Sequence, residues 1–452
     1  MKQQNSKGVP MRHSAIAIAV AALSLGVALP AAATNGYFAH GYGAQSKAMA
    51  GVGVAMSLDG LTPATNPAGL VGVEDGLDVG ISYFSPDRGY DVSGGPSGAC
   101  MSAQQCTFGV GPGSLRSSRD YFLIPNIGWV HRLDEQSVIG IAVYGNGGMN
   151  TRYVGGSATF GAPVGTVPPG TAVTYPGTFG GGTAGVDLMQ LFIAPTYARG
   201  FGNGASFGIS PVIAMQLFEA RGLGSFAPFS SDPNNLTDNG HDTAYGFGLK
   251  LGVQVPMGDS AKFGASYQSK MSMGKFDNYA GLFEGGGSFD IPATATVGVA
   301  VQPSDKWTMG VDVQWIGYGG VDAIANPMFP NLMTAPLGAD GGPGFGWDDM
   351  TVYKFGGSVK TSDRGKLHFG YSKTSQPVPS SEVLFNILAP GVVEQHFTVG
   401  YTQLTESGNR WTLSGMYAPS KKVRGVNPLD PAQTIELSMN QFDIEFSYHF
   451  GH

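Results

Sequence analysis

The sequence has 452 residues, of which 71 are glycine and 13% are charged, and its formal net charge is −7. A soluble surface usually carries a larger share of charged residues, so this composition favours a chain that faces lipid. The negative balance offers no basic surface of the kind that binds nucleic acid, and we expect no nucleic-acid partner.

The first 33 residues are typical of a secretory signal peptide. Three basic residues precede an apolar run over residues 15–29, which leads to an Ala-x-Ala cleavage site at residues 31–33. We expect the mature chain to begin at Thr34. No later stretch reaches the roughly 18 apolar residues that a spanning helix needs. This leaves an exported soluble protein or a membrane β-barrel.

Residues 34–75 fit no strand pattern and are rich in small residues. A compact segment before the first strand of a barrel is well placed to fold into the lumen. We therefore predict a plug over this range. Within it, Asn66 and Pro67 have the residue types of a helix N-cap followed by the first helical position, which gives them a local role as well.

Cys100 and Cys106 lie in a stretch rich in Gly, Ser and Pro. Export would bring them into an oxidising compartment, so we predict a loop disulfide. Two cysteines are too few ligands for a metal, and we expect no metal site and no cofactor.

From residue 76 onward the dominant signal is alternation of apolar and polar or small residues with period two, which is typical of a strand whose faces meet different solvents. It is clearest over residues 245–255 and 307–315. In the last strand the aromatic residues from Phe442 to Phe450 fall on one face. Because Ile435, Leu437 and Met439 have the opposite parity, we predict a bulge near Asn440.

Fourteen such segments can be read. An even number of membrane-spanning strands returns both ends of the chain to the same side of the membrane. Tight turns, such as residues 133–136 and 302–305, alternate strictly with long connections, as in bacterial outer-membrane barrels. A soluble β-sandwich has no reason to segregate its loops in this way. The sequence therefore predicts an all-β, fourteen-stranded antiparallel transmembrane barrel over residues 76–450, with strands near 76–84, 121–131, 137–144, 187–199, 205–219, 244–255, 261–273, 292–301, 306–316, 351–361, 366–374, 395–403, 409–418 and 434–450.

The segment with Asn66-Pro67-Ala68 resembles the hatch of the FadL-type family of outer-membrane transporters for long-chain fatty acids and aromatic hydrocarbons (OmpP1/FadL/TodX-like). Residues 145–150, 276–283, 346–349 and 376–379 also agree with that family. The order of these short motifs along the strands covers essentially the whole mature chain. The resemblance implies a small, partly helical N-terminal hatch that plugs the lumen and moves to release substrate, with a gating set of Thr34, Asn35, Gly36, Tyr37, Phe38, Asn66, Pro67 and Ala68.

The resemblance further implies uptake of hydrophobic compounds, captured by two external loops, in which we expect an exposed apolar patch. The same residues could instead only pack the loops together over the barrel mouth. They are Phe226, Phe229, Leu236, Phe276, Tyr279, Leu282 and Phe283.

The resemblance also implies release into the bilayer through a kink in the third strand, which Gly145, Gly147 and Gly148 would permit because glycine weakens strand pairing. The alternative is that the strand ends there and a flexible loop begins. In the lumen, we expect the inward charges to pair with one another. A lysine left free would favour fatty acids, and full pairing would favour aromatic compounds or alkanes. These charges are Lys250, Asp312, Lys354, Asp443 and Glu445.

Two rival functions remain. A general porin would need an open, charged constriction and no hatch. A hydrolase would need His131, His241, His368 or His396 in a catalytic arrangement, and none of them shows the spacing of a nucleophile elbow or of a metal site. We expect no enzyme activity, a monomer in the outer membrane of a Gram-negative bacterium, and contact with the barrel-assembly machinery during biogenesis.

Overall fold

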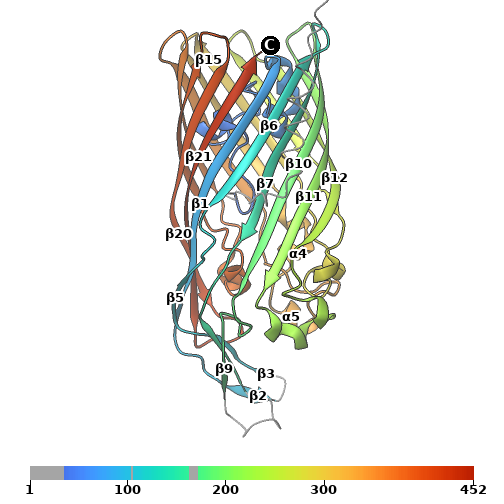
Figure 1. The fold of residues 1–452 in the computed structure, drawn as a ribbon, viewed down its shortest axis with the longest axis vertical. Coiled ribbons are helices and arrows are strands. Elements are labelled where there is room, and N and C mark those ends of the chain that lie inside the picture. Colours follow the sequence, from blue (N-terminus) through green and yellow to red (C-terminus); the bar gives the residue numbers. More distant parts are fainter. Residues whose placement is uncertain (1–34, 103–104, 162–171, 452) are drawn as a thin grey trace, which may run out of the picture.

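The fold is a closed antiparallel β-barrel, seen in a computed structural model that describes residues 35–102, 105–161 and 172–451 (Figure 1). The predicted signal peptide and Thr34 lie outside the described residues. Among the described residues the main sheet has 16 strands, of which two, β5 and β14, are short additions, so 14 long strands form the wall. Pairing of β11 with β12 closes the sheet on itself.

Each of the fourteen predicted strands coincides with one long strand of the wall, so the predicted fold class is confirmed. Most boundaries agree within a few residues, but β1 and β20 run well past their predicted ends. The strands are β1 (Gly76–Ser93), β6 (Phe122–Arg132), β7 (Ser137–Asn150), β10 (Gly185–Gly200), β11 (Ser206–Arg221), β12 (Asp242–Pro256), β13 (Ala261–Gln268), β15 (Thr294–Ser304), β16 (Trp307–Ile316), β17 (Met350–Lys360), β18 (Gly365–Thr374), β19 (Gln395–Leu404), β20 (Arg410–Val426) and β21 (Thr434–Gly451).

Tight turns lie at one end of the barrel and long connections at the other, as predicted. We call these the turn end and the loop end; the C-terminus lies at the turn end (Figure 1). None of the described helices is long and apolar enough to cross a membrane. The loop end carries β2 (Cys100–Ser102), β3 (Gln105–Cys106), β4 (Phe108–Val110), β5 (Gly113–Arg116), β8 (Ser157–Phe160), β9 (Val173–Pro176), β14 (Ser272–Met273), η3 (Gly224–Phe229), η4 (Pro233–Asn235), η5 (Asp277–Tyr279), α3 (Glu284–Gly287), η6 (Tyr318–Gly320), α4 (Asp322–Ala325), α5 (Asn331–Thr334), η7 (Ser380–Glu382) and η8 (Phe385–Ile387).

The apolar face of the strands points outward. On β12, Tyr245 is 60% exposed and Phe247 is 70% exposed, whereas Lys250 and Gln254 are buried. On β16, Val311 is 50% exposed and its neighbour Asp312 is buried. This arrangement suits a barrel that presents apolar side chains to lipid and polar ones to its lumen.

The bulge predicted near Asn440 is wrong. The pairing of β21 with β1 runs without a shift from Thr434 to Gly451. The register shift in this region lies instead on the neighbouring strand β20, between Ala418 and Lys421. Ile435, Leu437 and Met439 keep the inward parity of Asp443 and are buried, because the lumen is filled by apolar side chains at this level.

Residues 35–75 lie inside the barrel, and we call them the inner segment. They include α2 (Ala44–Ala48), η1 (Thr62–Ala64) and η2 (Pro67–Gly72). The helix α2 contacts β18 to β21, and η2 contacts β7 and β10 to β12, so the segment spans the lumen between opposite walls. Most of its residues are buried, and Gly72 and Glu74 near its end are exposed.

Candidate functional site

A buried ion pair joins the inner segment to the barrel wall. Lys47 in α2 places its Nζ atom 3.1 Å from Asp443 and 2.8 Å from Glu445 on β21. The same ammonium donates to the hydroxyl of Ser82 at 3.1 Å. The sequence reasoning missed Lys47, although it is the only Lys or Arg between residues 35 and 75.

The other lumen charges hold the backbone of the inner segment. Asp312 accepts from the amides of Gly53 at 2.8 Å and Val54 at 3.0 Å. Lys250 donates to the carbonyl of Ala64, and Lys354 approaches two carbonyls of the inner segment at 3.4 Å.

The prediction that the five strand charges pair with one another is therefore wrong. Within the described part of the chain, no two of them lie within ion-pair distance, although Asp312 and Lys354 are direct partners in the ladder between β16 and β17 and attract each other. Backbone groups buried away from water must find partners, and these side chains supply them to the inner segment.

Asn66 has both a local and a long-range role. Its side chain accepts from the amide of Ala68 at 3.0 Å, which caps η2, and Pro67 stands at the first position, as predicted. Its Nδ2 also donates to the carbonyl of Val54 at 2.6 Å and to that of Val253 on β12 at 3.0 Å. The asparagine thus fixes the helix and ties it to the wall.

The start of the inner segment enters an aromatic cluster. The ring of Tyr37 lies 5.3 Å from that of Tyr318 and 6.1 Å from that of Trp347, between centroids. The Tyr318 hydroxyl donates to the carbonyl of Asn35 at 2.5 Å. Burial raises the pKa of Tyr318, so its hydroxyl stays protonated and remains a donor. Gly36 is required here, because it has a φ of 64° and a Cβ would lie 2.9 Å from the Trp347 ring.

Strands β6 and β7 separate toward the loop end. Their ladder stops at Ile127 and Val143. Beyond that point β6 continues only along β1, and β7 continues along β10 to Asn150. The alternative that the third strand ends at its glycines is therefore wrong, because Gly145, Gly147 and Gly148 all remain paired with β10.

The inner segment takes the edge of β7 that β6 leaves. Phe38 forms an antiparallel bridge with Gly147, and the amide of Gly148 donates to the carbonyl of Tyr37 at 2.9 Å. A register shift at this level leaves Asn146 as an extra residue in β7. A Cβ on Gly147 would lie 1.8 Å from the Tyr37 carbonyl oxygen, so this close approach requires glycine.

The apolar residues predicted to form an exposed patch are mostly buried. Phe229 is 39% exposed, but Phe226, Leu236, Phe276, Tyr279 and Phe283 are all at or below 5%. Leu282 is partly buried against the same cluster. The expectation of exposure was wrong because the loops fold over one another and cover the rings. This is the alternative in which these residues pack the loops together over the barrel mouth.

A narrow apolar cavity remains between these loops, and we call it the loop pocket. Its volume is about 40 Å³. Phe226 and Leu282 line it together with Phe283, Phe345 and Phe385, and none of its lining side chains is charged or polar. The first three come from the two loops predicted for capture, and the other two from loops that the sequence reasoning did not single out.

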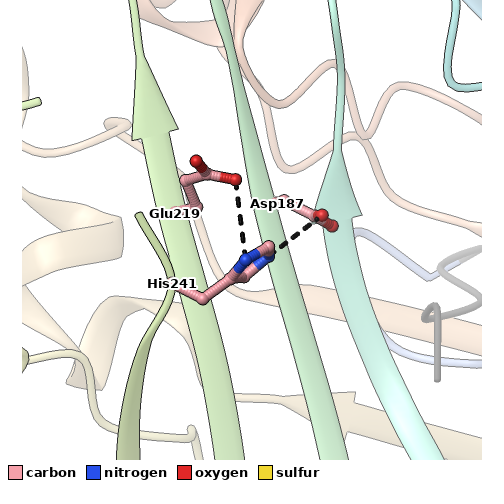
Figure 2. A group of neighbouring side chains, drawn as sticks. All are labelled: Asp187, Glu219 and His241. Atoms are coloured by element: carbon pink, nitrogen blue, oxygen red, sulfur yellow. Dashed lines mark hydrogen bonds and ion pairs between the residues drawn. The ribbon is translucent and has the colours of Figure 1, made fainter. Parts of the chain in front are cut away.

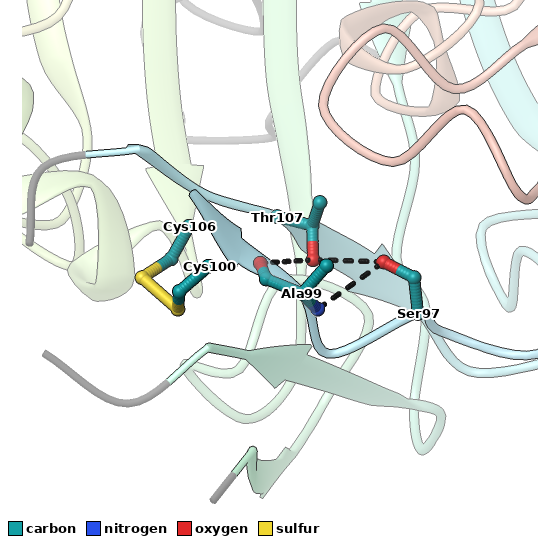
Figure 3. Close-up of a disulfide and its surroundings, with 5 residues drawn as sticks. All are labelled: Ser97, Ala99, Cys100, Cys106 and Thr107. Atoms are coloured by element: carbon teal, nitrogen blue, oxygen red, sulfur yellow. Dashed lines mark hydrogen bonds between the residues drawn. A yellow bond between two sulfur atoms is a disulfide. The ribbon is translucent and has the colours of Figure 1, made fainter. Parts of the chain in front are cut away.

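The disulfide between Cys100 and Cys106 is formed as predicted, with the sulfurs 2.10 Å apart (Figure 3). It joins β2 to β3 at the far tip of the loop end (Figure 1). The hydroxyl of Thr107 beside it donates to the carbonyl of Ala99 at 3.1 Å. The two cysteines do not line the loop pocket, but the ring of Phe108, two residues after Cys106, lies 5.4 Å from that of Phe226, which does.

His241, one of the histidines considered for hydrolysis, lies between two carboxylates (Figure 2). Its Nε2 is 3.3 Å from Asp187, and its Nδ1 is 3.7 Å from Glu219. Three such groups can hold a metal ion. However, Arg221 already donates twice to Glu219, at 2.8 and 2.7 Å, and Arg119 lies 3.3 Å from Asp187. The cluster is an ion-pair network, and we assign no metal to it.

The remaining histidines occupy separate environments. His131 stacks on Trp129 at 5.8 Å, and His368 is hydrogen-bonded to the hydroxyl of Thr402 at 2.8 Å. His396 is fully buried and stacks on His40 of the inner segment at 5.8 Å. These contacts are structural, and they give no support to a hydrolase.

The chain is similar in fold to solved transport proteins. It shares 18% identity and a TM-score of 0.62 with the Pseudomonas putida toluene transporter TodX, with 92% of this chain and 99% of that chain covered. With a Pseudomonas aeruginosa FadL homologue it shares 13% identity and a TM-score of 0.62, with 92% of this chain and 99% of that chain covered. With the Ralstonia pickettii toluene transporter TbuX it shares 14% identity and a TM-score of 0.52, with 91% of this chain and 98% of that chain covered.

No curated protein matches the sequence. A family model described as "Outer membrane protein transport protein (OMPP1/FadL/TodX)" matches residues 155–405, which is more than half of the chain. Together with the closed fourteen-stranded barrel, this match confirms the predicted family and the outer-membrane location. The chain is therefore a member of the OMPP1/FadL/TodX family of outer membrane transport proteins.

Proposed function

We propose that this protein takes up neutral hydrophobic compounds, which it captures in the loop pocket and releases sideways between β6 and β7. The observation that carries the proposal is the lining of the loop pocket, which has no charged or polar side chain. Each methylene removed from water there gains about 0.8 kcal/mol. A carboxylate in the same place would lose its hydration without a partner.

The lumen also favours a neutral substrate over a fatty acid. Lys250 and Lys354 are buried and directed at carbonyl groups of the inner segment. A fatty acid would need a cation to replace the water around its head group. Two of the three solved structures compared above are described as toluene transporters, which agrees with this preference.

Capture requires the loop pocket to widen. Its volume of about 40 Å³ is well below the cavity of roughly 150 Å³ that holds a benzene molecule in an engineered protein. Leu282 and Phe283 belong to a loop that has only the three short elements β14, η5 and α3, so they are the side chains we expect to move. Binding then couples loop displacement to the aromatic cluster around Tyr37.

Release requires the inner segment to leave β7. The bridge between Phe38 and Gly147 occupies the strand edge that faces β6. Movement of residues 37–39 would expose this edge and connect the aromatic cluster with the bilayer. In this proposal the inner segment is the hatch, and Asn35 to Phe38 are its gating residues.

The test compares uptake of labelled toluene with that of labelled palmitate by cells that have this barrel as their only such transporter. We expect toluene to enter and Leu282→Asp to lower its uptake about tenfold, which corresponds to roughly 1.4 kcal/mol of lost binding. Leu133→Asp is the matched control, because Leu133 is 53% exposed in a turn at the other end.

Uptake of palmitate in place of toluene would refute the neutral substrate. A large, steady ion current through the wild-type barrel in a planar bilayer would favour a porin instead.

A further inference from the structure

A second cavity, of about 620 Å³, opens at the turn end of the barrel, which is the periplasmic end. We call it the vestibule. Its floor is the underside of the inner segment and includes the apolar side chains of Met49, Ala55 and Met56. The loop pocket lies at the opposite end, so the two cavities are separate sites.

The wall of the vestibule is basic. Five basic and three acidic side chains line it. The strands supply only cations to it, namely Lys262 from β13, Lys360 from β17, Lys366 from β18 and Arg410 from β20. The acidic side chains come from the turns and from the end of the inner segment, where Glu74 already pairs with Arg410 at 3.4 Å.

Two of these lysines face each other, and Glu74, the carboxylate that attracts Lys366, is already paired with Arg410. Lys360 and Lys366 are direct partners in the ladder between β17 and β18, so their side chains share one face. Among the described residues, neither ammonium makes a hydrogen bond or an ion pair. Like charges directly opposite each other destabilise a sheet, and an anion between them would remove that cost.

A hydroxyl group adds a donor near this pair. Ser358 lies two residues before Lys360 on the same inward face, whereas Thr402, opposite Lys366 on β19, already bonds His368 and Thr412. Cations and a hydroxyl next to an apolar floor match a molecule with an anionic head and an apolar tail.

We propose that the vestibule binds an amphipathic anion from the periplasmic side, with its carboxylate or phosphate head between Lys360 and Lys366 and its apolar chain on Met49, Ala55 and Met56. This site is independent of the transported substrate, because the loop pocket is uncharged. A ligand in the vestibule would contact the inner segment from the turn end.

The test measures binding of decanoate and decyl phosphate to the full mature protein in amphipol by titration calorimetry, with decanol as the neutral analogue. We expect at least one of the two anions to bind. The double variant Lys360→Ala/Lys366→Ala should weaken this binding at least tenfold. Lys366→Glu should abolish it, because it gives Lys360 a partner of its own. Lys306→Ala is the matched control, since Lys306 is an exposed lysine of the same barrel end that does not line the vestibule.

The proposal is overturned if neither anion binds, or if the double variant binds them as tightly as the wild type. It is also overturned if Lys306→Ala weakens binding as much, since the effect would then be one of net charge. Binding of only one of the two anions supports the site and identifies its head group. The variant Leu282→Asp should bind the anions normally, so a failed uptake experiment leaves this site standing.

Discussion

The inner face of the barrel has different chemistry at its two ends. Toward the turn end, the inward residues of β21 include Asp443 and Glu445, which hold the inner segment through Lys47. Toward the loop end, the inward residues of the same strand are Ile435 and Leu437, both fully buried among apolar side chains. One strand face is therefore polar where it meets the inner segment and apolar where it meets the loops.

The contents of the lumen explain this difference. The inner segment brings backbone amides and carbonyls close to the wall, and buried backbone groups must be paired. Charged side chains such as Asp312 meet that need. The loops instead bring aromatic side chains to the wall, and these are stabilised by removal from water. The polar end thus fixes the position of the inner segment, and the apolar end offers a surface of loop side chains that can rearrange.

Removal of the lysine at the polar end should have the largest effect. Lys47→Ala leaves Asp443 and Glu445 buried without their cation, and loss of one partner of a buried pair costs roughly 3–5 kcal/mol. We expect the inner segment to detach while the barrel stays closed. Single-channel conductance in a planar bilayer should rise, and heat-modifiable gel mobility should be unchanged.

The matched control is Lys422→Ala. Lys422 forms a pair of 2.6 Å with Glu436, but it is exposed and screened by water, so its removal should leave the conductance unchanged. If Lys47→Ala left the conductance at the wild-type level, the ion pair would not be what holds the inner segment. Recovery of low conductance in Lys47→Ala/Asp443→Asn/Glu445→Gln would assign the defect to the unpaired carboxylates.

Gly147 lies where the inner segment meets the separation of β6 and β7, and its replacement should have an intermediate effect. Gly147→Val forces a side chain against the Tyr37 carbonyl, and overpacking of this kind costs roughly 1–3 kcal/mol. We expect toluene uptake to fall about tenfold at normal barrel levels, equivalent to roughly 1.4 kcal/mol, because the added side chain would obstruct the passage that opens between β6 and β7 when residues 37–39 move.

Gly415→Val on β20 is the control for this change, since a Cβ there meets no atom within 4 Å. Undiminished uptake by Gly147→Val would exclude sideways release through this part of the wall.

The disulfide belongs neither to the polar end nor to the apolar end of the lumen, so its loss should have the smallest effect. Cys100→Ser/Cys106→Ser removes a link between residues only six positions apart at the loop tip. Short closed loops gain little from a cross-link. We expect toluene uptake within about twofold of the wild type, and faster proteolysis near residue 100, since loop tips are preferred sites of cleavage. A severe loss of uptake would mean that the tip takes part in capture.

The sequence was sufficient for the barrel wall and for some local features. Period-two alternation is set by each strand alone, so residues 245–255 indicated which side chains face lipid. Turn and loop lengths likewise fixed the antiparallel order. The N-cap at Asn66 and the disulfide involve residues close together in the chain, and both were predicted correctly.

The contacts inside the barrel could not be read in this way. Parity placed Asp443 and Glu445 in the lumen but could not identify Lys47, almost 400 positions away, as their partner. The burial of Ile435 and of Phe276 likewise depends on distant loops that fill the barrel mouth. The local chain thus determined which face of each strand points to lipid and which to the lumen. Only the tertiary structure decided what the lumen face contacts, because the contents of the lumen come from remote parts of the sequence.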